Sequence, residues 1–167
     1  MLIVRGAAAA DIAAITAIYR HHVVHGVASF ETDPPDETEM TRRRDSVVSA
    51  DLPYLVAELK GLVIGYAYAG PYRTRPAYRN SIENSVYVHA DHYGQGAGKA
   101  LMAELIVRCR AAGLRQMIAI IGDSANTASI RLHEAFGFRN VGTLTDVGFK
   151  HDRWLDSVIM QLDLCDV

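Results

Sequence analysis

The chain has 167 residues, of which 50% are hydrophobic and 22% charged, and its formal net charge is −2. This length is that of one globular domain with a substantial core, which we place over residues 1–167. The balanced charge and the lack of a long apolar run argue against a nucleic-acid partner and against a membrane protein. Cys109 and Cys165 form no metal or redox spacing and are predicted to be free thiols in a reducing cytoplasm.

The first half of the chain predicts a strand, two helices and a hairpin. A short strand at residues 2–4 precedes apolar residues at helical spacing up to His25. Asp36 is expected to cap a second helix that ends near Ala50 and buries three apolar side chains, namely Met40, Val47 and Val48. Two apolar segments, 54–59 and 62–69, flank Lys60-Gly61 and are typical of a β-hairpin.

The second half alternates strands and helices. A β-branched run at 82–88 predicts a strand, and residues 99–112 predict a helix that buries Leu101, Leu105 and either Val107 or the stem of Arg108. Gly113 is expected to end this helix. A strand covered on both faces at 117–121, a short helix to about 135 and final strands at 141–149 and 157–164 follow. Because hairpins come first and crossovers later, we predict an α/β fold with a mixed sheet.

Three alternating glycines, Gly94, Gly96 and Gly98, follow the strand at 82–88 and open the next helix. Such a turn directs backbone N–H groups and the positive end of the helix dipole at one spot. Glycine allows a phosphate to approach the backbone because it has no Cβ. The segment therefore predicts a site for a cofactor that carries phosphate groups.

Two common phosphate motifs do not fit this segment. A dinucleotide-binding fingerprint follows the first strand and has an acidic residue about twenty positions further on. Here the glycines follow about the fourth predicted strand, position 118 is an isoleucine, and Asp123 lies too far along. A Walker A loop needs Gly and Ser or Thr where this chain has Tyr93 and Ala100.

The segment Tyr93–Gly98, taken with Asn126–Phe138, resembles the GNAT N-acetyltransferase superfamily. Its signatures are Arg/Gln-x-x-Gly-x-Gly/Ala and Asn-x-x-Ala-x-x-x-Tyr-x-x-x-Gly-Phe. Tyr93 replaces the usual Arg or Gln, and His133 replaces the usual Tyr. From Ile3 to Leu164 the chain is similar to the phosphinothricin/methionine sulfoximine acetyltransferase family, on stretches that include 69–78, 83–88, 132–138 and 148–151 with Trp154.

The resemblance implies a GNAT fold and acetyl-CoA as co-substrate, with no metal. The cofactor-binding residues that it implies come from the strand, the glycine turn and the second motif: Val86, Tyr87, Val88, Gly94, Gln95, Gly96, Ala97, Gly98, Lys99 and Asn126. Backbone groups at 86–88 are expected to pair with the pantetheine arm as an added strand does. One of these N–H groups is a candidate oxyanion donor for the thioester carbonyl.

Two residues are candidates for the acid–base chemistry, because an ammonium must lose a proton before it attacks a thioester. Glu83 stands just before the central strand, and the family assigns its matching glutamate the role of base. A free carboxylate, with a pKa of about 4.3, is a poor base for an amine, so we expect it to act through a water or with a pKa raised by burial. His133 is expected either to protonate the departing thiolate or to hold the substrate.

The acceptor is predicted to be a small amine with an anionic group. Arg73, Arg75 and Arg79 crowd one loop, and Arg binds carboxylate or phosphinate through two hydrogen bonds. The resemblance implies eight substrate-binding residues: Phe30, Arg73, Thr74, Arg75, Tyr78, Glu83, Asn84 and Ser85. It favours phosphinothricin, methionine sulfoximine or methionine sulfone as acceptor, in a detoxifying, cytoplasmic homodimer.

Two alternatives stay open. A GNAT enzyme could acetylate another amine, such as a polyamine, an aminoglycoside or a protein N-terminus, but a cationic acceptor should favour acids where this loop has arginines. A non-catalytic acyl-CoA-binding module would keep the phosphate site without needing Glu83 and His133.

Overall fold

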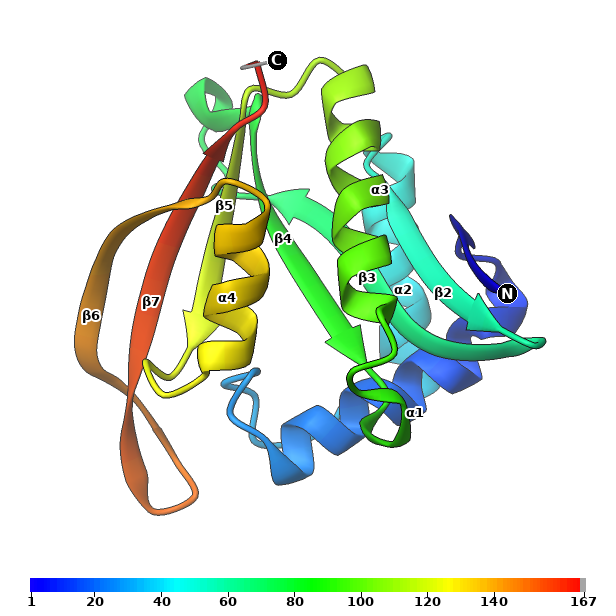
Figure 1. The fold of residues 1–167 in the computed structure, drawn as a ribbon, viewed down its shortest axis with the longest axis horizontal. Helices are drawn as coiled ribbons and strands as arrows, with labels where there is room; N and C mark the ends of the chain where they lie inside the picture. Colours follow the sequence, from blue (N-terminus) through cyan, green and yellow to red (C-terminus); the bar gives the residue numbers. More distant parts are fainter. Residues whose placement is uncertain (166–167) are drawn as a thin grey trace.

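The computed structural model describes residues 1–165 and contains a seven-stranded sheet in the order β1-β2-β3-β4-β5-β7-β6 (Figure 1). The strands are β1 (Leu2–Gly6), β2 (Tyr54–Leu59), β3 (Leu62–Pro71), β4 (Ser81–Val88), β5 (Gln116–Gly122), β6 (Arg139–Lys150) and β7 (Arg153–Asp163). The β4–β5 pair is parallel, and the other neighbouring strands are antiparallel. The predicted α/β fold with a mixed sheet is confirmed.

Four helices cover the two faces of this sheet: α1 (Ile12–His25), α2 (Glu37–Ser49), α3 (Ala97–Ala111) and α4 (Thr127–Ala135). Helices α3 and α4 lie on the face toward the viewer in Figure 1, and α1 and α2 lie behind the sheet. Behind it, Ile15 and Ile18 of α1 share a core with Tyr66 of β3. In front, Leu101 and Leu105 of α3 belong to the larger core, which also includes residues of β5 and β7.

Local chemistry sets the element boundaries that the sequence predicts. The Asp36 side chain accepts a hydrogen bond from the Glu39 N–H and caps α2. Gly113 follows the last turn of α3 with a φ of +73°, a conformation that favours glycine. The hairpin between β6 and β7 is longer than predicted, since His151 and Asp152 form its turn with φ values of +51° and +57°. This hairpin projects at the lower left of Figure 1.

Three expectations about burial are wrong. Val48 is exposed because each helical residue rotates by about 100°, which carries it past the buried stripe of Met40 and Val47. For the same reason neither Val107 nor Arg108 is buried, and α3 buries Met102, Ile106 and Cys109 instead. Ile120 of β5 is 39% exposed, since α1 and α2 pack on β2 to β4 and leave its side of β5 open.

Candidate functional site

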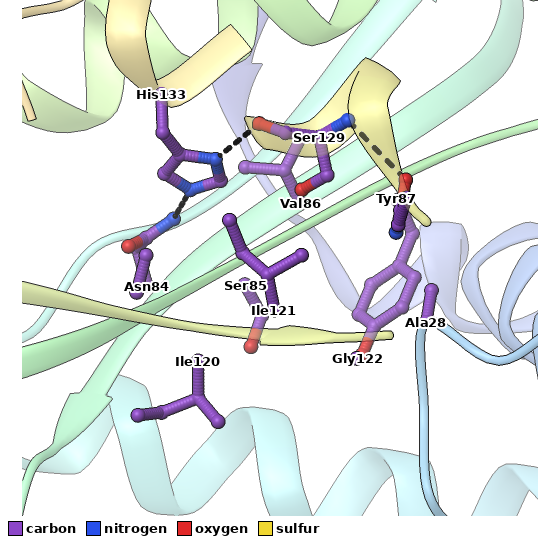
Figure 2. Close-up of a pocket in the computed structure, with 12 residues that line it drawn as sticks. Ala28, Asn84, Ser85, Val86, Tyr87, Ile120, Ile121, Gly122, Ser129 and His133 are labelled. Atoms are coloured by element: carbon purple, nitrogen blue, oxygen red, sulfur yellow. Dashed lines mark hydrogen bonds between the residues drawn. The ribbon is translucent and has the colours of Figure 1, made fainter. Parts of the chain in front are cut away.

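The sheet opens between β4 and β5. Strand β4 pairs with β3 as far as Val88, but its pairing with β5 stops at Asn84 opposite Ala119. Within residues 1–165, Ser85–Val88 therefore has no strand partner on the β5 side. A pocket fills this β4–β5 opening, with walls from β4, β5 and α4 (Figure 2). The freed backbone groups are suited to pair with an extended ligand.

A larger groove of about 920 Å³ leads from this opening to the start of α3. Gly94 and Gly96 have φ values of +74° and +84°, a conformation that L side chains rarely adopt. Helix α3 begins at Ala97, directly after these glycines, and Lys99 adds a positive charge to the groove. Backbone N–H groups and the positive end of the α3 dipole thus meet at one end of the groove, an arrangement suited to phosphate groups.

The candidate cofactor residues meet in these two cavities, with one departure. Tyr87 lines the β4–β5 opening, and the groove is lined by Val86, Val88, Gly94, Gly96, Ala97, Gly98, Lys99 and Asn126. Gln95 is not among the lining residues, because its side chain bonds the His92 ring and the Asp91 carbonyl. The Asn126 side chain caps α4 by accepting from the Ser129 N–H at 3.3 Å. Tyr93, in place of the usual Arg or Gln, lines the groove with an exposed ring.

His22 is a groove residue whose contact with β4 was not predicted from the sequence. Its Nε2 lies 2.8 Å from the Val88 carbonyl oxygen and donates to it, which fixes the end of β4 against α1. Burial lowers the pKa of this imidazole, and the hydrogen bond to Val88 opposes that shift. Its spacing with the apolar residues of α1 indicates a buried position but not the partner.

Glu83 projects from the opposite face of β4. Side chains alternate along a strand, so Glu83, Ser85 and Tyr87 face the side covered by α1 and α2. Gly70 of β3 stands opposite Glu83, and a Cβ built on Gly70 would contact the Tyr68 ring at 3.9 Å. Burial raises the pKa of Glu83, as expected, and the Arg73 guanidinium partly offsets this rise. The carboxylate is therefore a stronger base than a free glutamate.

The arginine loop forms a pocket that is separate from the β4–β5 opening and from the groove. Arg73, Thr74, Arg75 and Tyr78 line an open cavity of about 450 Å³ between β3 and β4. The Arg73 guanidinium lies 5.0 Å from the Tyr72 ring centre. In the part of the chain that the structure describes, neither arginine forms an ion pair. Both cations are thus available to an anionic ligand.

Phe30, from the loop that joins α1 to α2, packs over two glycines of different strands. A Cβ on Gly148 would lie 2.5 Å from the Phe30 ring, and a Cβ on Gly122 would lie 3.0 Å from it. The same loop is held by Lys150, which is 5% exposed and donates from Nζ to the Ser29 carbonyl oxygen at 2.7 Å. The sequence does not predict this lysine contact, which spans 121 residues.

Asn84 and His133 face α4, away from Glu83. The Asn84 amide nitrogen lies 2.9 Å from His133 Nε2, and His133 Nδ1 lies 2.7 Å from the Ser129 carbonyl oxygen (Figure 2). Asn84 is 6% exposed and His133 4%. Burial lowers the pKa of His133, and the bond to Ser129 opposes this shift. Asn84 thus lies at the β4–β5 opening, and its side chain is hydrogen-bonded to His133.

Residues 1–165 contain no group of three or more His, Cys, Asp or Glu side chains placed to hold a metal ion. None of the described helices has the length and apolar character needed to cross a membrane. Cys109 and Cys165 are both free thiols, as predicted.

Comparison with known proteins gives consistent matches. Residues 15–138 match the Acetyltransferase (GNAT) family. The chain is 56% identical over 154 residues to the phosphinothricin N-acetyltransferase of Alcaligenes faecalis. These residues make up 92% of this chain and 78% of that protein. It is 41% identical to the L-methionine sulfoximine/L-methionine sulfone acetyltransferase of Salmonella typhimurium, over 96% of this chain and 94% of that protein. A solved GNAT phosphinothricin acetyltransferase from Sinorhizobium meliloti, in complex with acetyl-CoA, is 48% identical with a TM-score of 0.94, over 97% of this chain and 88% of that one.

Proposed function

The chain belongs to the GNAT acetyltransferase family and is an N-acetyltransferase that uses acetyl-CoA, and on this premise we propose that its acceptor is a small, anionic, amino-acid-like amine. Phosphinothricin, methionine sulfoximine and methionine sulfone are the favoured acceptors. The observation that carries the proposal is the half-buried Glu83, whose pKa burial raises and Arg73 lowers, together with a pocket in which Arg73 and Arg75 have no carboxylate partner.

The donor is held by backbone groups on one side of β4. The start of α3, with Gly94, Gly96 and Lys99, binds the phosphates of acetyl-CoA. The freed backbone at Val86–Val88 pairs with the pantetheine arm, and one of its N–H groups polarises the thioester carbonyl. Acetyl-CoA supplies the activated acetyl group at this opening.

The acceptor meets the donor from the Glu83 side of the same strand. Glu83, through a water molecule, removes a proton from the acceptor's ammonium group. The neutral nitrogen then attacks the thioester carbon, so a C–N bond forms and the C–S bond breaks. The nitrogen loses a second proton as the amide forms, and a proton is taken up by the departing thiolate. The products are the N-acetylated acceptor and free CoA.

The acceptor's anionic group is bound by the arginine loop. Arg73 and Arg75 offer paired N–H donors to a carboxylate or phosphinate, with Thr74 and Tyr78 at the same cavity. A polyamine or an aminoglycoside would bring positive charge to this pocket, and the described lining contains no acid to receive it. A non-catalytic acyl-CoA-binding module would not require a half-buried carboxylate with a raised pKa at position 83.

We further propose that the enzyme is a homodimer that detoxifies its acceptors in the cytoplasm. Exposed apolar side chains gather on the β6–β7 hairpin, among them Leu144, Val147, Phe149 and Trp154. Such a surface favours contact with a second copy. Two free thiols are typical of a reducing compartment. Light scattering of the purified protein tests the dimer: a mass of one chain at micromolar concentration would contradict it.

An acceptor panel tests the proposed function. The rate of CoA release and the mass of the product are measured with methionine sulfoximine, phosphinothricin, methionine sulfone, common amino acids, a polyamine and an aminoglycoside. We expect the highest kcat/KM with the three favoured acceptors and an increase of 42 Da in product mass, the mass of an added acetyl group. Turnover of the polyamine or the aminoglycoside alone would overturn the acceptor proposal, and no turnover with any amine would favour the binding module.

A further inference from the structure

His133 has hydrogen-bond partners on both ring nitrogens. Nδ1 lies 2.7 Å from the Ser129 carbonyl oxygen, which only accepts, so the ring must carry its proton on Nδ1. The other nitrogen, Nε2, lies 2.9 Å from the Asn84 amide nitrogen. An amide nitrogen only donates, so Nε2 must accept and cannot carry a proton. The two contacts together specify the neutral Nδ1–H tautomer.

A protonated ring does not fit these surroundings. It would need Asn84 turned so that its oxygen faces Nε2, and it would leave a buried cation among uncharged groups. His133 is 4% exposed, and its ring contacts a carbonyl, an amide and the Phe138 ring, whose centroid lies 4.9 Å from that of the imidazole. Of the charged groups on the elements around it, Glu83 projects from the other face of β4, and Arg131 and Glu134 of α4 are exposed. None of them stabilises an imidazolium at this position.

The contact lies at the point where the sheet opens. Asn84 opposite Ala119 is the last residue of the β4–β5 pairing, and the Asn84–His133 bond joins β4 to α4 there. Ser129 and His133 of α4 line the opening together with Asn84 (Figure 2). The bond therefore sets the distance between α4 and β4, the two elements that the donor must pass between.

We propose that Asn84 holds His133 as a neutral hydrogen-bond acceptor, and that the Asn84–His133 pair positions α4 and β4 around acetyl-CoA instead of supplying the proton for the leaving thiolate. The second half of this inference rests on the proposed function, whereas the tautomer does not. Asn84 and His133 are thus positioning residues. The proton that the thiolate requires comes from the acceptor's nitrogen or from water.

Nitrogen NMR of the imidazole reads the tautomer directly. The ¹⁵N shifts and long-range ¹H–¹⁵N couplings of His133 are recorded from about pH 6 to about pH 9, without ligand and with CoA bound, and are assigned with the His133→Gln variant. We expect a protonated Nδ1 and an unprotonated Nε2 throughout. An Nε2–H tautomer, or an imidazolium near neutral pH, would overturn the proposal. Because this readout needs no turnover, it stands whether or not the favoured acceptors are acetylated.

Kinetics of two His133 variants separate positioning from acid catalysis. Glutamine retains an acceptor for Asn84 but cannot act as a general acid, so His133→Gln should keep kcat within about fivefold of wild type, the effect of one ordinary hydrogen bond. His133→Ala loses the contact and should raise KM for acetyl-CoA more than it lowers kcat. A general acid contributes about 10²–10⁴ to the rate. A kcat loss of that size in both variants, with KM unchanged, would contradict the positioning role.

A double-mutant cycle with Asn84→Ala completes the test. If the two residues act as one contact, the KM effect of the double variant should match that of the larger single variant. Multiplication of the two single effects would show independent roles and overturn the pairing. Ser46→Ala on the exposed surface of α2, far from the opening, is the control and should leave both KM values unchanged.

Discussion

The two sides of β4 present different kinds of groups, backbone on one side and side chains on the other. On the α3 and α4 side the proposed donor site consists largely of backbone: the freed strand at 86–88, two glycines with positive φ and the start of α3. On the α1 and α2 side the proposed acceptor site consists of side chains, namely Glu83, Phe30 and the arginines of an exposed loop. A backbone site depends on strand pairing and turn geometry, so the same ligand can be kept while the acceptor side chains change.

This difference predicts which substrate each substitution affects. Changes in the glycine turn should alter the binding of acetyl-CoA, and changes in the loop should alter the binding of the acceptor. Glu83 lies on the strand that both sides share, so its loss should affect the chemical step with every acceptor. The substitutions below test this division from the largest expected effect to the smallest.

Glu83→Gln should have the largest effect. The amide keeps the shape of the side chain but removes the base, so kcat should fall by about 10²–10⁴ with little change in KM for acetyl-CoA. Steady-state kinetics with methionine sulfoximine provides the measurement. Glu104→Gln on α3, which loses only the contact with Arg108, is the matched control. Wild-type kcat in Glu83→Gln would remove Glu83 from the mechanism.

Replacement of Arg73 and Arg75 by Gln should weaken the binding of the acceptor and leave the binding of acetyl-CoA unchanged. Each charge-assisted bond contributes about 1.5–3 kcal/mol, so KM for an anionic acceptor should rise at least tenfold while KM for acetyl-CoA stays the same. The control is Arg42→Gln, an exposed arginine on α2 that pairs with Glu39. An equal rise in KM for the acceptor and for acetyl-CoA would show that the two binding sites are not separate.

Gly96→Ala should weaken the binding of acetyl-CoA. Its φ of +84° strains any L side chain by about 1–2 kcal/mol, and relief of this strain would rotate the N–H groups at the start of α3. We expect KM for acetyl-CoA to rise by about tenfold, with KM for the acceptor unchanged. Gly61→Ala is a close control, because Gly61 has a φ of +83° in the hairpin between β2 and β3. Both variants should lose similar stability on thermal unfolding, but only Gly96→Ala should lose affinity.

Gly148→Ala should have the smallest effect on catalysis. Its Cβ would lie 2.5 Å from the Phe30 ring, so the ring must move, at a cost of about 1–3 kcal/mol in stability. We expect a rise of a few-fold in KM for the acceptor and a lower melting temperature. Gly142→Ala, on the same strand with nothing within 4 Å of the new Cβ, is the control. Unchanged acceptor kinetics in Gly148→Ala would mean that Phe30 does not border the acceptor.

The parts of the fold that local chemistry sets were predicted from the sequence. The Asp36 cap, the Lys60-Gly61 turn and the glycines before α3 act within a few residues of themselves, so their pattern is enough. The errors at Val48, Val107 and Ile120 concern burial, which depends on how far a neighbouring element extends across the sheet. No periodicity within a single element contains that information.

The candidate site likewise has features that short motifs predict and contacts that only the tertiary fold creates. The glycine turn could be located from its own pattern, and Asn126 was implied by the resemblance to the family's second motif. By contrast, the contacts of His22 with Val88, of Lys150 with Ser29 and of Asn84 with His133 join residues 66, 121 and 49 positions apart. The raised pKa of Glu83 also arises only when the sheet buries it. Each of these requires the tertiary fold.

The pH dependence of kcat/KM tests the central claim most directly, that β4 presents to the acceptor a base whose strength is set by burial and by Arg73. Because the base must be deprotonated, activity should fall as the pH drops through the pKa of Glu83, which burial raises above the usual value of about 4.3. Since the Arg73 charge lowers this pKa, Arg73→Gln should move the acid limb to higher pH, and Arg42→Gln should leave it in place. An acid limb that stays fixed or moves to lower pH in Arg73→Gln would contradict the account.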